Sequence, residues 1–279
     1  MLFTDFKTYL FKIVTHLVLI IGVFITLFPL FWMISGSLKP PHEIFSTTLR
    51  LIPKNPTLEN YRFVFSTIPL LRELFNSIII ASGYTLLSLF FCSLAGFAFA
   101  KHHFPGRYFL FFFLLATMMV PVEVGIIPSF LIIKALKWVN TYYAVIIPGS
   151  ASAFGIFFMR QYIATVPDEV IDAAKIDGCS DFRTYSQIIL PIIKPALVAL
   201  GIMHFMFSWN SFLWPLLVLR TYDMYTIVLG VNLIPAQEFD TPWGAVLAGC
   251  TVAVLPLIVF FLIFQKHFIS GITLGAVKG

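Results

Sequence analysis

The densest group of ionisable side chains lies in residues 163–187, a polar segment between two apolar runs. It holds five acids and two cations: Asp168, Glu169, Asp172, Asp177, Asp181, Lys175 and Arg183. Pro167 suits the first turn of a helix, acids directly after it favour the positive end of the helix dipole, and Gly178 supplies a left-handed stop. The spacing therefore predicts a short charged helix of about three turns, suited to ion pairing and docking.

One face of this predicted helix is shallow, because residues at spacings of three and four include two small side chains: Val170, Ala173, Ala174 and Asp177. Asp172 can pair with Lys175 on an adjoining face. Two interpretations of the alanine face remain open. The face packs under the protein's own helices, or it accepts the groove of a partner, which can approach closely because the side chains are small.

Glu123 is a second candidate, since a carboxylate inside an apolar run is costly in a membrane. It lies between Pro121 and Pro128, which remove backbone donors and loosen a helix. We expect Glu123 either to face a translocation path or to accept hydrogen bonds from a partner subunit.

A third group contains Trp209, Asn210 and Ser211, followed closely by Trp214. Aromatic faces stack on sugar rings and amides bond their hydroxyls, so the cluster suits a carbohydrate path. Tryptophans near the end of an apolar run are also typical of a belt at the membrane surface, and this interpretation stays open. His204, on the same run, is expected to make an interhelical hydrogen bond rather than to relay protons.

Motifs for catalysis are missing from the sequence. It contains no His-Glu-x-x-His or Gly-x-Ser-x-Gly pattern, no Cys/His cluster that could hold zinc, and no Gly-Lys dipeptide, hence no phosphate-binding loop. We therefore expect a protein that is not an enzyme, with no catalytic residue, no metal and no cofactor.

Composition places these residues in a membrane protein. Of the 279 residues 59% are hydrophobic and 11% are charged, and the mean hydropathy is +0.93. These values exclude a soluble domain, a disordered tail and a nucleic-acid binder. The net charge of +5 then indicates membrane topology and contact with anionic lipid.

Polar and proline-rich breaks leave six apolar runs long enough to cross a bilayer, near residues 11–34, 74–100, 107–134, 142–162, 188–219 and 243–265. The runs predict an all-α polytopic membrane protein with six transmembrane helices and one transmembrane domain over residues 1–279. Residues 35–71 are predicted to form an external surface loop, and residues 266–279 a tail. Both termini then lie on one side, and the slight excess of cations there favours the cytoplasm.

The charged segment also carries a recognisable motif. Asp172-Ala173-Ala174, three residues, Gly178, nine residues, Ile188, one residue and Leu190-Pro191 resemble the EAA loop, Glu-Ala-Ala-x3-Gly-x9-Ile-x-Leu-Pro, of ABC importer permeases. Asp172 is the departure, because it keeps the charge of the family's glutamate but shortens its reach.

The resemblance covers nearly the whole chain and is nearest to the carbohydrate-uptake branch, in particular to the smaller permease of maltose-type systems. Segments similar to that branch are residues 37–41, 52–61, 76–77, 104–106, 160–161, 209–215 and 271–279. Ser211 stands where the branch more often has an acid.

The resemblance implies the type I permease fold of ABC importers, in a bacterial plasma membrane, with residues 163–187 as a cytoplasmic coupling loop. The implied partners are a second permease subunit, two cytoplasmic ATP-binding subunits and an external solute-binding protein that delivers a sugar. Any ATP must be bound by another chain, since this one has no phosphate-binding loop. The residues that the coupling role would involve are Asp168, Asp172, Ala173, Ala174, Lys175 and Gly178.

Two alternatives remain. A secondary transporter would carry coupling-ion carboxylates deep in several runs, whereas this sequence offers essentially Glu123 alone. An ABC permease for a glycerol-phosphate-like solute is compatible with the same motifs, because the sequence does not identify the solute.

Overall fold

The structure is a computed structural model that describes residues 2–44, 50–234 and 242–273, with side chains described for 11–44, 50–234 and 242–265. Within these ranges the regular structure is helical and no strand occurs, which confirms the predicted all-α fold. The chain falls into two compact units, Met1–Leu70 with Val231–Leu255 and Leu71–Gly230 with Pro256–Gly279.

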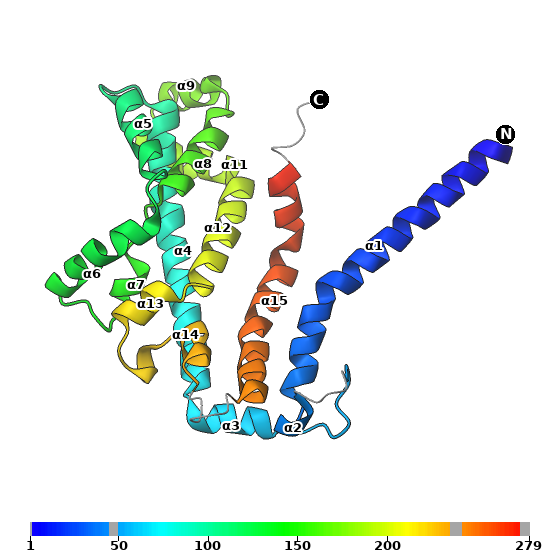
Figure 1. The fold of residues 1–279 in the computed structure, drawn as a ribbon. Helices are drawn as coiled ribbons and strands as arrows, with labels where there is room; N and C mark the ends of the chain where they lie inside the picture. Colours follow the sequence, from blue (N-terminus) through cyan, green and yellow to red (C-terminus); the bar gives the residue numbers. More distant parts are fainter. Residues whose placement is uncertain (1, 45–49, 235–241, 274–279) are drawn as a thin grey trace. The chain divides into compact units, whose positions relative to one another are not determined.

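The first unit is built mainly from the long helix α1 (Leu2–Ser37), the short helices α2 (Pro41–Ile44) and α3 (Glu59–Thr67), and the first half of α15 (Trp243–Thr273) (Figure 1). The most apolar stretch of α1 is not buried in the structure. Its side chains are therefore available to lipid or to another protein.

Within the range 35–71, predicted to form a surface loop, the described residues 35–44 and 50–71 include short helices and several buried polar side chains. Lys39 is 1% exposed, and its Nζ donates to the carbonyl oxygen of Arg50 at 2.6 Å. Asn60 donates from Nδ2 to the carbonyl oxygens of Ser37 and Lys39, each at 2.8 Å. Buried polar side chains thus satisfy backbone groups that the prolines leave without a long helix, and an external loop at 35–71 stays a prediction.

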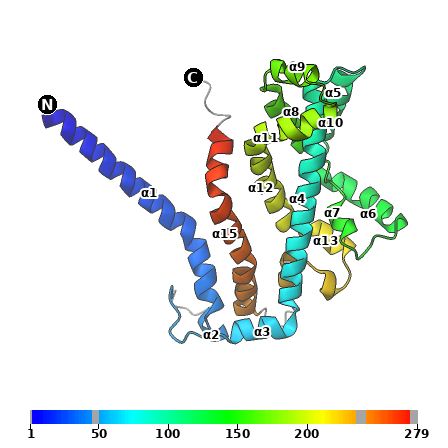
Figure 2. The same cartoon turned by 180° about the vertical axis from the view of Figure 1, so that it is seen from behind.

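The second unit contains α4 (Leu70–Lys101) together with shorter elements, most of which lie along it or at its two ends (Figures 1 and 2). In chain order these are α5 (Arg107–Thr117), η1 (Val122–Gly125), α6 (Ile126–Ala135), α7 (Tyr143–Ile146), α8 (Ala153–Ala164), α9 (Asp168–Ile176), α10 (Asp181–Arg183), η2 (Thr184–Ile189), α11 (Leu190–Ile192), α12 (Lys194–Trp209), α13 (Leu213–Val218), η3 (Tyr222–Met224) and α14 (Ile227–Asn232).

Three continuous helices are long and apolar enough to cross a membrane, at Phe11–Ser37, Leu70–Lys101 and Trp243–Gln265. They correspond to the first, second and last of the six predicted runs. Within the described residues the chain therefore has several candidate spans, as expected of a polytopic membrane protein.

The other three runs are broken rather than straight. Arg107–Thr117 and Val122–Ala135 form a pair bent by 95° within the run at 107–134. Asp181–Ile192 and Lys194–Trp209 form a second pair, bent by 81° near the start of the run at 188–219. The run at 142–162 divides into α7 and the twelve-residue α8, with a left-handed Gly149 between them (φ +76°). Against the six predicted spans, the described residues give three, or up to five if each bent pair is one span, because prolines and this glycine interrupt the backbone hydrogen bonds of the broken runs.

The second unit packs α4, α8, η2 and α12 around one apolar core. Its buried members are Cys92, Phe97, Ile156, Met159, Ile163, Val166, Ile171, Tyr185, Ile189, Ile193, Ala196 and Leu200. Gly96 permits the close approach of α4 to α8, because a Cβ there would lie 2.8 Å from the Cβ of Met159 and 2.9 Å from the amide nitrogen of Arg160. The element before α9 is thus firmly packed against α4.

His204 makes the predicted interhelical contact. Its Nδ1 lies 2.6 Å from Ser88 Oγ on α4, and its Nε2 lies 3.4 Å from Ser152 Oγ at the start of α8. The ring also stacks on Tyr84 at 5.7 Å between centroids. This buried side chain therefore holds α4, α8 and α12 together, and the prediction is confirmed.

The predicted tail at 266–279 begins as helix, since α15 continues to Thr273. Residues 274–279 lie outside the described residues, so a cytoplasmic tail stays a prediction.

Candidate functional site

Helix α9 forms where the sequence predicted it. Pro167 precedes the helix, Asp168 and Glu169 occupy its first turn, and it ends at Ile176. Gly178 has φ +75°, and a Cβ placed there would have no neighbour within 4 Å. The glycine is therefore required by backbone conformation rather than by space.

Two backbone hydrogen bonds close the helix end. The amide of Gly178 donates to the carbonyl oxygen of Lys175 at 3.0 Å, and the amide of Cys179 donates to that of Ala174 at 2.9 Å. This pair of bonds is a Schellman motif, which satisfies carbonyl groups that a helix end otherwise leaves open. The predicted left-handed stop at Gly178 is confirmed.

The two sides of α9 differ in exposure. Ile171 and Ala174 are 6% and 2% exposed and pack against the protein's own helices. The opposite side is open, and its residues recur at offsets of three, four and seven: Glu169, Asp172, Ala173 and Ile176. We call these four residues the outer stripe. Ile176 is 86% exposed, so a partner that covered its side chain would gain the free energy of burying it.

The two alanines of the motif therefore have different surroundings. Ala174 packs against the protein's own helices, which is the first of the two interpretations of the alanine face. Its side chain is therefore not open to a partner. Ala173 is exposed, and the second interpretation is available only to it. Neighbouring residues on a helix are separated by about 100°, so adjacent alanines cannot both lie at the centre of one face.

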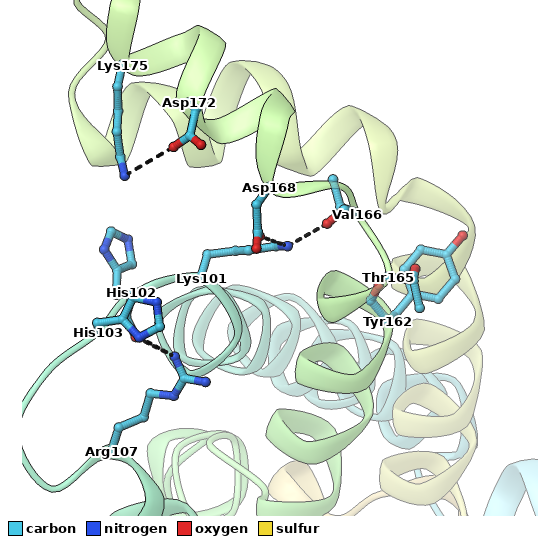
Figure 3. A network of polar contacts seen from close by, with 10 residues as sticks. All are labelled: Lys101, His102, His103, Arg107, Tyr162, Thr165, Val166, Asp168, Asp172 and Lys175. Carbon is cyan, nitrogen blue, oxygen red and sulfur yellow. Dashed lines mark hydrogen bonds and ion pairs between the residues drawn. The ribbon is translucent and has the colours of Figure 1, made fainter.

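Lys101, at the end of α4, contacts the start of α9 (Figure 3). Its Nζ donates to the carbonyl oxygen of Val166 and to Asp168 Oδ1, each at 2.5 Å. The Lys101 side chain is 5% exposed and that of Asp168 is 80% exposed. The buried ammonium thus holds the residues that begin α9, a role that sequence reasoning missed because the partners lie 65 and 67 positions away.

The hydrogen bond from Lys101, followed by the charge of the same ammonium, holds the pKa of Asp168 below its ordinary value. His103 and Lys175 act in the same direction. Asp172 and Lys175 also form the predicted pair, with Oδ1 and Nζ 3.9 Å apart and both side chains largely exposed. Such an exposed pair adds little stability, so its main effect is the charge pattern of the outer stripe.

The lowered pKa of Asp168 gives a pH prediction. A carboxylate whose pKa is depressed by folding stabilises the fold above its unfolded pKa, about 3.9, and loses that effect as pH falls through the folded value. The difference in melting temperature between the wild type and Asp168→Asn should therefore be present at about pH 5 and shrink below about pH 4. A difference as large at about pH 2 as at about pH 5 would contradict the assignment.

The polar residues predicted for a translocation path lie on separate elements. Glu123 is exposed within η1, at the bend between α5 and α6, rather than midway along a straight span. Asn210 ends α12, where its Nδ2 donates to the carbonyl oxygen of Met206 at 2.8 Å, and Ser211 follows it, half-buried.

Trp209 is 2% exposed and stacks on Phe205 at 5.7 Å between ring centroids. Its ring is therefore not open to a sugar in this structure, and a part for Trp209 in a solute path stays a prediction. Trp214 makes a different contact: its Nε1 donates a hydrogen bond to the carbonyl oxygen of Ala144 at 2.8 Å. Neither observation favours a sugar platform made by these two rings.

Residues 92–274 match the family described as the inner membrane component of binding-protein-dependent transport systems, and the chain belongs to this family. It is 39% identical to the arabinooligosaccharides transport system permease protein AraQ of Halalkalibacterium halodurans, over 92% of each chain. It is 34% identical to the sn-glycerol-3-phosphate transport system permease protein UgpE of Escherichia coli, over 93% of this chain and 95% of UgpE.

The fold is also similar to a solved chain from a bacterial ABC transporter involved in the import of the acidic polysaccharide alginate. The TM-score is 0.81 at 22% sequence identity, and the match covers 93% of this chain and 97% of that one. Fold and family together make this chain a multi-pass inner membrane permease of the ABC importer type. This class carries solute, and the EAA motif is characteristic of it.

Proposed function

We propose that the chain is a permease subunit of an ATP-driven importer of a sugar or oligosaccharide, and that an ATP-binding subunit docks on the outer stripe. The outer stripe carries this proposal. It places one small side chain and one exposed isoleucine directly after two acids, on a helix whose other side is anchored in the bundle. An exposed apolar residue with charges around it fits a partner groove that buries the apolar side chain and places complementary charges opposite the acids.

The remaining partners follow from the same assignment. A second permease subunit completes the membrane core, two ATP-binding subunits lie in the cytoplasm, and a solute-binding protein delivers the solute on the opposite side. Helix α9 and both termini then face the cytoplasm, and the unburied apolar surface of α1 is available to lipid or to the second permease. The names of the carbohydrate relatives support a sugar as the solute.

A crosslinking experiment tests the docking assignment. In a chain whose native cysteines are replaced by serine, Ala173→Cys should crosslink to the ATP-binding subunit of the assembled complex. Ala174→Cys is the matched control, because the neighbouring alanine is buried and should give no crosslink. Equal crosslinking of the two variants, or none at Ala173→Cys, would contradict docking on the outer stripe.

The solute class requires a transport measurement. Proteoliposomes that contain the complete importer should take up an arabino-oligosaccharide in preference to sn-glycerol 3-phosphate when ATP is enclosed. Preferential uptake of glycerol phosphate would replace the sugar by the glycerol-phosphate alternative without affecting the docking assignment. Uptake driven by an ion gradient without ATP would favour a secondary transporter.

A further inference from the structure

Helix α4 is attached at both ends to segments that are distant in the sequence. It runs without interruption over 32 residues and contains no proline. An α-helix of this length spans about 48 Å, which is enough to cross a bilayer with turns to spare. In Figures 1 and 2 its one end lies near α9 and its other end near α14.

At the first end the attachment is the Lys101 contact. The ammonium is nearly buried, and it satisfies both a backbone carbonyl group before α9 and the first carboxylate of α9. Charge-assisted hydrogen bonds of this kind are stronger than neutral ones, and removing the donor leaves the carbonyl oxygen of Val166 without this partner. The start of α9 is therefore fixed to α4 independently of the chain that leads into it.

At the other end the attachment is made by Asn76 and Ser77, which are 0% and 2% exposed. Asn76 Nδ2 donates to the carbonyl oxygens of Asp223 and Tyr225 at 2.8 and 2.9 Å. Ser77 Oγ accepts the amide of Ile227 at 2.8 Å. Buried hydrogen bonds to backbone groups specify position closely, so residues 223–227 follow the start of α4.

The covalent route from α9 into the membrane is less direct. Helix α8, which leads into α9, has twelve residues, and the chain before it turns through Gly149 at φ +76°. Helix α8 is also held against α4, because Gly96 allows a close approach to Met159 and Tyr84 Oη donates to the carbonyl oxygen of Gly149 at 3.2 Å. The broken chain before α9 therefore leans on the unbroken α4.

We propose that Lys101 is a positioning residue for the docking helix, and that through it α4 carries ATP-driven movement of α9 to residues 223–227. This inference rests on the proposed function, because it takes α9 as the surface on which the ATP-binding subunit acts. Coupling between distant sites can be carried by rigid helices and the polar contacts at their ends, and α4 with its two polar attachments is such a connection.

The test compares Lys101→Met with wild type in the complete complex, using ATP and orthovanadate to trap the closed state. In the wild type, trapping should change amide hydrogen exchange at residues 223–227. In Lys101→Met the complex should assemble and hydrolyse ATP, but the change at 223–227 should fall about tenfold, as expected for the loss of a charge-assisted contact. Lys134→Met removes an exposed lysine of α6 by the same substitution and should behave as wild type.

Two further variants separate positioning from general stability. Lys101→Arg keeps both donor functions and should restore most of the exchange change, whereas a loss as large as in Lys101→Met would overturn the proposal. Asp168→Asn keeps the contact with Val166 and should give an intermediate loss. An exchange response in Lys101→Met equal to that of the wild type would also overturn the proposal that α4 carries the movement of α9 to residues 223–227.

The crosslink at Ala173→Cys makes the two failures distinguishable. If this crosslink is absent in the wild-type background, the docking assignment fails, and the inference fails with it. If the crosslink persists in Lys101→Met while exchange at 223–227 still responds fully to trapping, the docking assignment stands. Only the proposed connection through Lys101 and α4 then fails.

Discussion

Replacing Ala173 with tryptophan should remove the ATP-binding subunit from the complex while leaving the permease folded. Ala173 lies on the outer stripe, so the indole would project into the space that a docked groove occupies. A contact residue of this kind is worth about 2 kcal/mol, or about thirtyfold in Kd. Co-purification of the ATP-binding subunit and coupled ATP hydrolysis should both be lost, and the melting temperature of the isolated permease should be unchanged.

Ala174→Trp is the matched control and should give the opposite pattern. Ala174 is 2% exposed, so the larger ring must displace the core residues beneath α9. Overpacking typically costs about 1–3 kcal/mol, which should appear as a lower melting temperature of the permease before any partner is added. If Ala174→Trp left the melting temperature unchanged, or Ala173→Trp lowered it as much, the two faces of α9 would be wrongly assigned.

Gly178→Val should impair coupling more than any other substitution in the loop after α9. The residue has φ +75°, where a Cβ costs roughly 1–2 kcal/mol, and a β-branched side chain is worse placed than most. No atom lies within 4 Å of the added Cβ, so the cost comes entirely from the backbone. Helix α9 should lose its Schellman end and tilt, and solute-stimulated ATP hydrolysis should fall about tenfold.

Asparagine separates conformation from side-chain size at this position. Gly178→Asn adds a side chain of similar bulk, but asparagine tolerates the left-handed region, so this variant should retain most of the stimulated hydrolysis. Cys179→Val should likewise have a small effect, because the backbone of Cys179 itself is not in the left-handed region. Equal losses in Gly178→Asn and Gly178→Val would show that the position matters for contact rather than for backbone conformation.

Local features of the docking helix could be predicted from the sequence because their causes are local. Pro167, the acids after it and Gly178 act within one or two turns, and the structure has the helix and its left-handed stop where those residues place them. The membrane class follows equally directly, since hydrophobic composition needs no knowledge of contacts. His204 was also predictable, because a buried imidazole must find hydrogen-bond partners in any fold of this kind.

The sequence said less where the outcome depends on packing between elements. It predicted six apolar spans, whereas the described residues give three continuous ones, or up to five with the bent pairs, because composition does not say whether a proline bends a helix or is accommodated in it. The chemistry of Trp209 left a solute path and a membrane belt open, and only its packing against Phe205 showed that the ring is buried. The described part of residues 35–71 folds through contacts such as Asn60 with Ser37, which span 23 positions.

The sequence alone thus determined that the chain is helical, lies in a membrane and carries a short charged helix with a glycine stop, because these properties depend on residues close together in the chain. Only the tertiary structure decided which of the two alanines is open and that Lys101 holds the start of α9. The rotation of a helix about its axis is set by the elements it packs against, and a contact across 67 positions leaves no periodic trace in the sequence.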